Sequence, residues 1–144
     1  MSVDTMNALK ISRTIRADRE SVWQAWTQPE QVEKWSCPVP GGVRGFEHDL
    51  RVGGSYTLAM EVEGKAHTAF GRYREVDPPS RLVYTWDWKE APMGETLVTV
   101  EFEERDGATV VTLTHEGFPE AAIKESHVQG WTACLDHFEA LLDA

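Results

Sequence analysis

GRYREVDPPSRLVYTWDW, residues 71–88, is the stretch of the sequence that decides the fold. Two runs rich in aromatic and β-branched residues flank a turn at residues 77–80, and this pattern predicts a β-hairpin. Four of its rings would then lie close together: Tyr73, Tyr84, Trp86 and Trp88. Such a concentration of rings either fills the core of the domain or lines a space for another molecule.

The hairpin belongs to a longer run of predicted strands between Val43 and Glu116. Apolar and polar residues alternate over residues 55–63 and again over residues 96–104, as they do in half-buried strands. Short turns such as RDG, residues 105–107, join successive strands. Six consecutive strands with short connections predict an antiparallel meander that has one buried face and one face in water.

The segments before this meander predict one more strand and two short helices. Residues 8–16 alternate in polarity and indicate the strand. Asp18 can cap a first helix, whereas Pro29 ends it and can occupy the first turn of a second helix that reaches Trp35. Residues 36–42, SCPVPGG, have the composition of a loop.

The last predicted element is a long helix over residues 120–142, with Pro119 where a first helical turn tolerates it. Its apolar stripe consists of His127, Trp131, Cys134, Leu135, Phe138, Leu141 and Leu142. Gly130 lies inside this helix, where glycine costs about 1 kcal/mol relative to alanine. It indicates either a close approach of another backbone or room left beside a ligand.

These elements predict an α+β fold in a single domain, residues 1–144. A curled antiparallel sheet would wrap around the long C-terminal helix, with two short helices after the first strand. The sheet and the helix would leave a wedge between them, and ligand pockets are usually apolar concavities of this kind.

Composition restricts the partners. The formal net charge is -10 and the sequence pI is about 4.9, so we expect neither nucleic acid nor an anionic membrane surface as a partner. No apolar run reaches the ~20 residues that span a bilayer. Residues 1–10 do not read as a secretory signal, and Cys37 and Cys134 suit reduced thiols, so we expect a cytoplasmic location.

Five segments carry a resemblance to a known family: residues 15–35, 51–56, 71–88, 111–118 and 130–142. In these segments the chain resembles the Hsp90-ATPase-activator-homologue-like (AHSA1-like) family. That family belongs to the START/Bet v 1-like (SRPBCC) superfamily. Five segments in the right order make the resemblance strong for the fold.

The resemblance covers residues 8–143 and implies the helix-grip fold, with a cavity for apolar molecules between the sheet and the C-terminal helix. Superfamily members include binding and transport proteins, cyclases and modules of larger enzymes. The family takes its name from the C-terminal domain of a eukaryotic co-chaperone. Because the chain resembles only that domain, we do not expect direct interaction with Hsp90.

The candidate ligand-binding residues are aromatic or imidazole side chains, some of which we expect to line a pocket: Tyr56, Phe70, Tyr73, Tyr84, Trp86, Trp88, His115, His127 and Trp131. The tyrosine and tryptophan rings could equally be core residues whose polar tips find partners. His115 could bind a ligand or act as an acid or base near neutral pH, or it could simply be hydrogen-bonded to a backbone carbonyl. We expect His67 to face solvent.

The sequence gives little support for a metal site, a catalytic nucleophile or a phosphate-binding site. Residues 46–50, FEHDL, cannot direct three consecutive side chains of one strand at a single metal ion. No nucleophile elbow and no phosphate-binding loop is present, so we predict no metal, no cofactor and no assigned catalytic residue. Arg51 and Arg72 could bind a ligand carboxylate near the mouth of the sheet, or pair with acidic residues of the chain.

Three functions therefore remain open. The first is binding of a small, largely apolar or aromatic molecule, as a carrier or in a stress response. The second is an enzyme of cyclase or hydrolase type that uses the same cavity, with His115 or a tyrosine as acid or base. The third is a chaperone-associated interaction module that uses the outer face of the sheet or residues 36–45. A homodimer is compatible with each of them.

Overall fold

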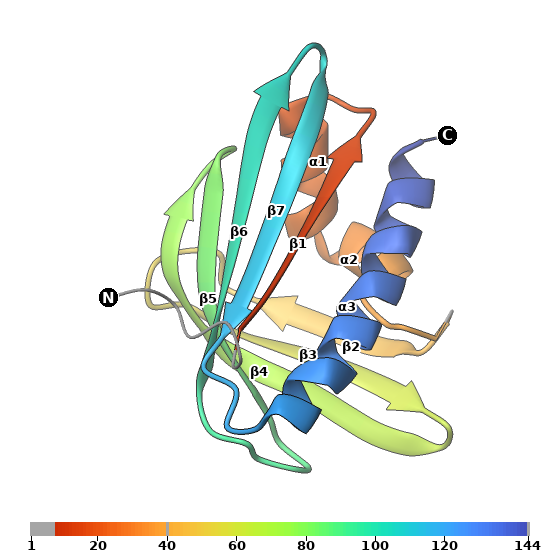
Figure 1. The fold of residues 1–144 in the computed structure, drawn as a ribbon, viewed down its shortest axis with the longest axis vertical. Coiled ribbons are helices and arrows are strands. Elements are labelled where there is room, and N and C mark those ends of the chain that lie inside the picture. The colour runs from red at the N-terminus through yellow and green to blue at the C-terminus, as the bar shows by residue number, and fades with distance from the viewer. Residues whose placement is uncertain (1–7, 40, 144) are drawn as a thin grey trace.

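The computed structural model describes residues 8–39 and 41–143, which form seven strands and three helices (Figure 1). The strands are β1 Ala8–Ile15, β2 Val43–His48, β3 Ser55–Val62, β4 Lys65–Asp77, β5 Arg81–Trp88, β6 Thr96–Arg105 and β7 Ala108–Glu116. The helices are α1 Arg19–Thr27, α2 Pro29–Trp35 and α3 Ala121–Leu142. This order is the one predicted from the sequence.

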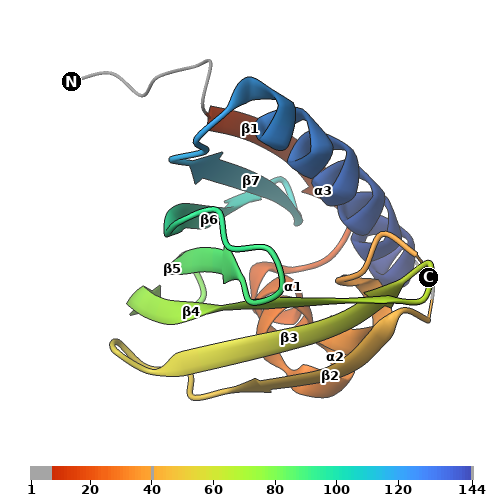
Figure 2. The same ribbon diagram turned by 90° about the horizontal axis from the view of Figure 1, so that it is seen from below.

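The strands form one antiparallel sheet in the order β1-β7-β6-β5-β4-β3-β2. Figure 2 shows the strands following one another along an arc that remains open on the side where α3 lies. The segment α1–α2 carries the chain from the β1 edge to the β2 edge, so that β1 pairs with the last strand. The predicted α+β fold with a curled sheet is confirmed.

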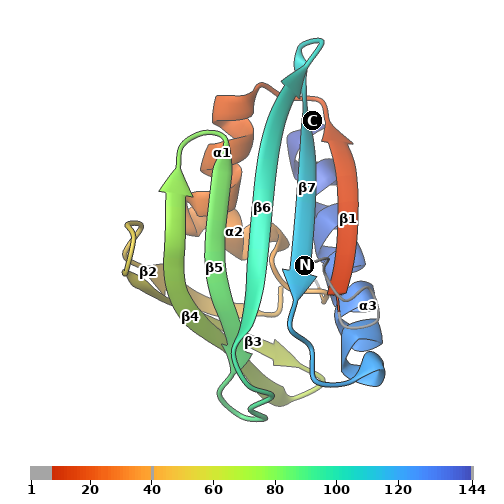
Figure 3. The same ribbon diagram turned by 60° about the vertical axis from the view of Figure 1, so that its left-hand side comes forward.

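Local signals explain the two short helices. The Asp18 carboxylate accepts a hydrogen bond from the backbone N–H of Ser21 and caps α1. Pro29 occupies the first turn of α2, where its missing N–H leaves no bond unmade. In the view of Figure 3 both helices lie behind the sheet, on the same side as α3.

Helix α3 buries one stripe against the sheet and the short helices. Its buried side chains are Trp131, Cys134, Leu135 and Phe138. The helix begins at Ala121 and not at Glu120, so Pro119 precedes it instead of occupying its first turn, which corrects that prediction. No helix in the described part of the chain has the length and apolarity needed to cross a lipid bilayer.

The β4–β5 hairpin places its rings in register. Tyr73 lies opposite Tyr84, and the register shifts in β4 immediately after Tyr73. Because the irregularity lies in β4, the alternation along β5 is preserved, and neighbouring rings of Tyr84, Trp86 and Trp88 contact one another with centroids 6.4 and 5.4 Å apart. These rings form the part of the sheet that faces α3.

Candidate functional site

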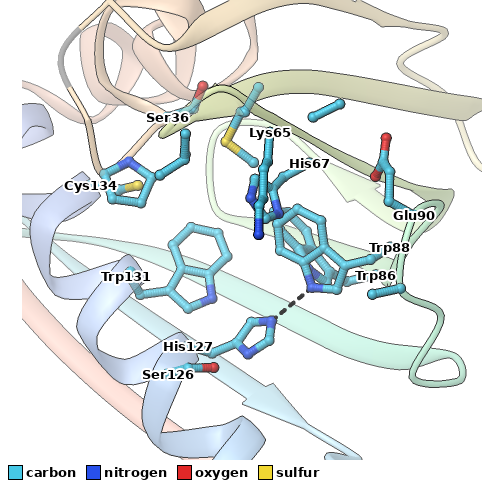
Figure 4. A pocket seen from close by; sticks show the side chains of 16 residues that line it. Ser36, Lys65, His67, Trp86, Trp88, Glu90, Ser126, His127, Trp131 and Cys134 are labelled. Carbon is cyan, nitrogen blue, oxygen red and sulfur yellow. Dashed lines mark hydrogen bonds between the residues drawn. The ribbon is translucent and has the colours of Figure 1, made fainter.

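A pocket of about 640 Å³ lies between the sheet and α3 (Figure 4). Three tryptophans form much of its wall: Trp86 and Trp88 project from β5, and Trp131 projects from α3 toward them. Met60 and Val62 of β3 add aliphatic surface. We call the three rings of Trp86, Trp88 and Trp131 the tryptophan end of the aromatic surface.

Polar side chains also line the pocket. They are Ser36, Lys65, His67, Glu90, Ser126 and His127. The Glu90 carboxylate accepts hydrogen bonds from the backbone N–H and hydroxyl of Thr68, which lower its pKa. Lys65 is exposed at this rim, and no salt bridge to it occurs within the described residues. The pocket therefore has an apolar interior and a charged rim.

The Trp88 indole is held by the helix. Its Nε1–H donates to His127 Nε2 over 3.0 Å, and His127 Nδ1–H donates to the carbonyl of Ile123 over 2.8 Å. Because the indole can only donate, His127 must be neutral, with its proton on Nδ1. Burial lowers the pKa of His127 and favours this neutral form.

The Trp131 indole is held by the sheet in the same manner. Its Nε1–H donates to His115 Nδ1 over 3.0 Å, and His115 Nε2–H donates to the Thr96 hydroxyl over 2.7 Å. That hydroxyl donates in turn to the carbonyl oxygen of Trp86. The chain of bonds links α3 to three adjacent strands and fixes the position of the Trp131 ring.

These bonds limit what the histidines can do chemically. His115 is fully buried, its two ring nitrogens are both occupied, and burial together with neighbouring His127 holds its pKa well below 6.5. A general acid or base must reach the proton that it transfers. His115 lines neither the large pocket nor the small one beneath it, so its geometry is that of a residue that positions tryptophans.

A second group of rings continues the same surface toward α1 and α2. This tyrosine end consists of Tyr56, Tyr73 and Tyr84. The Tyr56 hydroxyl donates to the carbonyl of Thr85, and the Tyr73 hydroxyl shares a hydrogen bond of 2.7 Å with His48. Only a small space of about 40 Å³ lies among these rings, and desolvation raises the pKa of all three phenols.

The structure thus divides the predicted ligand-binding residues. Trp86, Trp88, His127 and Trp131 line the large pocket, whereas the three tyrosines border only the small space and His115 borders neither. Phe70 lines neither pocket, and Lys89 Nζ lies 5.8 Å from its ring. It alternates with the fully buried Ala69, so it points to the other face of β4.

Three further predictions concern polar residues. His67 is exposed, as expected, yet it also borders the pocket, with its ring 6.2 Å from that of Trp88. Arg51 pairs with Asp49 over 2.6 Å, and Arg72 donates to the carbonyl of Gly53 over 3.2 Å. Neither arginine lines the large pocket.

Sequence reasoning missed several lining residues because they look unremarkable in the sequence. Met60 and Val62 alternate on one face of a predicted strand and could have been found from that pattern. Ser36 and Lys65 carry no such signal, since Ser36 follows the end of α2 and Lys65 is the first residue of β4. Cys134 was placed in the apolar stripe, and it is a buried free thiol whose pKa burial raises.

Comparisons with known proteins agree with this architecture. Protein CV1439 from Chromobacterium violaceum has a TM-score of 0.83 at 28% identity, over 96% of this chain and 98% of that chain. CalU16 from Micromonospora echinospora has a TM-score of 0.73 at 25% identity, over 94% and 75% of the two chains. Protein NE0264 from Nitrosomonas europaea, with a TM-score of 0.82 at 24% identity over 98% and 97%, shows the fold alone.

A search of curated proteins gives no match. The sequence model of the Activator of Hsp90 ATPase homolog 1-like proteins matches residues 16–143, nearly the whole chain, and the similar structures share the START/Bet v 1-like fold. The chain therefore belongs to the family of Activator of Hsp90 ATPase homolog 1-like proteins.

Proposed function

We propose that this domain binds a small, largely apolar or aromatic molecule in the pocket between the sheet and α3. The observation that carries the proposal is a pocket of about 640 Å³ whose wall is formed by three tryptophans and aliphatic side chains. Small-molecule sites typically have volumes of about 300–1,000 Å³ and a mostly apolar lining. Membership of a family with the START/Bet v 1-like fold supports the same function.

The hydrogen bonds around the pocket support binding over acid–base catalysis. Two histidines line the pocket, His67 and His127, and both nitrogens of His127 are already engaged by Trp88 and Ile123. A ligand would therefore meet ring faces that are fixed in position before it arrives. Such preorganisation reduces the entropy lost on binding, because the wall does not have to be ordered by the ligand.

The exposed surface gives less support to an interaction module. Among the described residues, only Val39 and Val52 are large hydrophobic side chains that are exposed. Interaction surfaces usually show a contiguous apolar patch of several hundred Å². Trp86, Trp88 and Trp131 line the pocket instead of forming an exposed patch.

Two measurements test the proposal. Native mass spectrometry of freshly purified protein should reveal a retained small molecule. If the pocket is emptied during purification, the uncharged fluorophore N-phenyl-1-naphthylamine should bind saturably with one site per chain and raise the melting temperature by mass action. Absence of both a retained molecule and saturable fluorophore binding would contradict the proposed function.

A further inference from the structure

The mouth of the large pocket carries two charged side chains. Among the described residues that line the pocket, Lys65 is the only lysine or arginine and Glu90 is the only carboxylate. The two side chains have opposite directions. Figure 4 shows Lys65 extending toward the indoles of Trp88 and Trp131, whereas the Glu90 carboxylate points away from them. The charge that faces the apolar wall is therefore positive.

Glu90 is already engaged within the protein. One carboxylate oxygen accepts the backbone N–H of Thr68 over 2.6 Å, and the other accepts the Thr68 hydroxyl over 2.7 Å. The backbone N–H of neighbouring Lys89 donates to the carbonyl of Thr68 over 2.9 Å. These three bonds fasten the segment after β5 to β4. Glu90 thus has a structural role at the rim that accounts for its position.

Lys65 has a fixed backbone and an unengaged amine. It pairs with Val62 across the turn between β3 and β4, in which Glu63 and Gly64 have φ values of 54° and 77°. Turns with positive φ at both central residues match the twist of the strands that they join. Within residues 8–39 and 41–143, the Lys65 ammonium forms no salt bridge. Scarcity of carboxylates is not the reason, because the chain has 24 acidic residues and 14 lysines and arginines.

We propose that the ligand is an amphipathic anion whose carboxylate binds Lys65 at the mouth while its apolar body lies against the tryptophan end. The ligand class is then an aromatic or aliphatic carboxylic acid. The inference rests on the proposed function and narrows it. An ammonium beside an apolar wall is less well solvated than one in open water, so its charge-assisted hydrogen bond to a carboxylate is strengthened. The apolar body would supply affinity and the carboxylate would set the orientation.

A matched pair of probes tests this class. 4-(2-Naphthyl)butanoic acid is an anion at neutral pH, and its primary amide has nearly the same shape without the charge. Their dissociation constants are measured by displacement of N-phenyl-1-naphthylamine from the wild-type protein and from three variants. Lys65→Met removes the charge, and Lys65→Arg keeps it. Lys89→Met is the control, since it removes the charge of another exposed lysine that does not line the pocket.

The decisive quantity is the affinity ratio of the acid to the amide. We expect Lys65→Met to lower this ratio about fivefold, and Lys65→Arg and Lys89→Met to change it less than about twofold. Raising the salt concentration from about 20 mM to about 500 mM should lower the ratio in the wild-type protein and leave it nearly constant in Lys65→Met.

Ratios that agree within about twofold in all four proteins would overturn the inference and leave the proposed function standing. The same holds if the fluorophore binds saturably but neither probe displaces it. Absence of both saturable fluorophore binding and a retained molecule would instead contradict the proposed function, and this inference would fail with it.

A crystal structure of the wild-type protein with 4-(2-naphthyl)butanoate tests the placement directly. The carboxylate should lie within about 4 Å of Lys65 Nζ, with the naphthyl ring against the three indoles. A naphthyl ring that occupies the pocket with its carboxylate directed away from Lys65 would overturn the inference.

Discussion

The tyrosine end and the tryptophan end of one aromatic surface have opposite properties. At the tyrosine end, phenols pack against one another around a space of about 40 Å³. At the tryptophan end, indoles border a pocket of about 640 Å³. The same strand, β5, supplies Tyr84 to the first and Trp86 and Trp88 to the second. Rings on one strand can thus fill a core and line a pocket.

The difference arises from what lies across from each end. Trp26 and Trp35 from α1 and α2 pack with Phe138 of α3, with ring centroids 4.5–5.2 Å apart, and they close the tyrosine end. Across from the tryptophan end, α3 presents Gly130, whose added Cβ would meet only Pro38 Cγ, at 3.9 Å. The small residue leaves space where a larger one would fill it.

The largest expected effect compares truncation at the two ends. Phe138→Ala removes a fully buried ring at the packed end and should lower the free energy of unfolding by about 3–5 kcal/mol. Trp88→Ala removes a half-buried ring that already borders a pocket, so we expect about 1–2 kcal/mol. Urea denaturation of both variants measures the difference. Equal losses would show that the tryptophan end is as solidly packed as the other.

The second effect concerns binding. Gly130→Phe should place a ring in the pocket and weaken N-phenyl-1-naphthylamine binding more than about tenfold, because the site loses volume. Gly130→Ala is the control: its methyl group has room, and the helix should gain about 1 kcal/mol of stability. Undiminished binding by a folded Gly130→Phe protein would locate the fluorophore elsewhere.

A third effect is a pH dependence that comes from the tryptophan end. His115 and His127 accept indole hydrogen bonds only while neutral, and burial lowers the pKa of each below 6.5. As the pH falls, these two histidines are therefore protonated in the unfolded chain before they are protonated in the folded protein. Their contribution to the free energy of unfolding is complete above about pH 6.5 and decreases below it. For His115 the slope reaches at most about 1.4 kcal/mol per pH unit.

Urea denaturation between about pH 7.5 and 5.5 measures this slope, and His127→Gln should reduce it without abolishing it. His48, at the tyrosine end, also has a pKa lowered by burial. NMR titration of the imidazole signals separates the three contributions. An imidazole of His115 that titrates near 6.5 in the folded protein would contradict the hydrogen-bond scheme.

The smallest effect compares two hydroxyl deletions. Tyr56→Phe leaves the carbonyl of Thr85 without its donor and should cost about 1–2 kcal/mol. Ser36→Ala removes a buried hydroxyl that has no partner, so the free energy of unfolding should stay the same or rise by up to about 1 kcal/mol. Thermal denaturation of the two variants provides the check. A marked loss of stability in Ser36→Ala would reveal a partner for that hydroxyl.

Most of the fold could be predicted because its signals are local. Alternation, the Asp18 cap, the position of Pro29 and the RDG turn each specify an element without knowledge of the rest. The site could be predicted only in part. The indole–imidazole bonds join residues 16 and 39 positions apart, and they depend on how α3 lies across the sheet.

The predicted rings that do not line the large pocket have the same origin. Phe70 and Tyr73 are both candidate pocket rings in the sequence, but an odd spacing on a strand places them on opposite faces. The tyrosines do face inward, but their position along the strands places them beneath α1 and α2, which alternation alone cannot reveal. Sequence patterns identify the inner face of a strand more readily than they identify which part of that face the helices leave uncovered.

The central claim is that the tryptophan end is hollow and the tyrosine end is not. The most direct test records the six indole N–H signals of the wild-type protein by NMR during titration with N-phenyl-1-naphthylamine. We predict that the signals of Trp86, Trp88 and Trp131 shift saturably while those of Trp23 and Trp35 stay in place. Saturable binding that leaves the signals of Trp86, Trp88 and Trp131 unmoved would contradict the account. So would binding that moves these three signals and those of Trp23 and Trp35 equally.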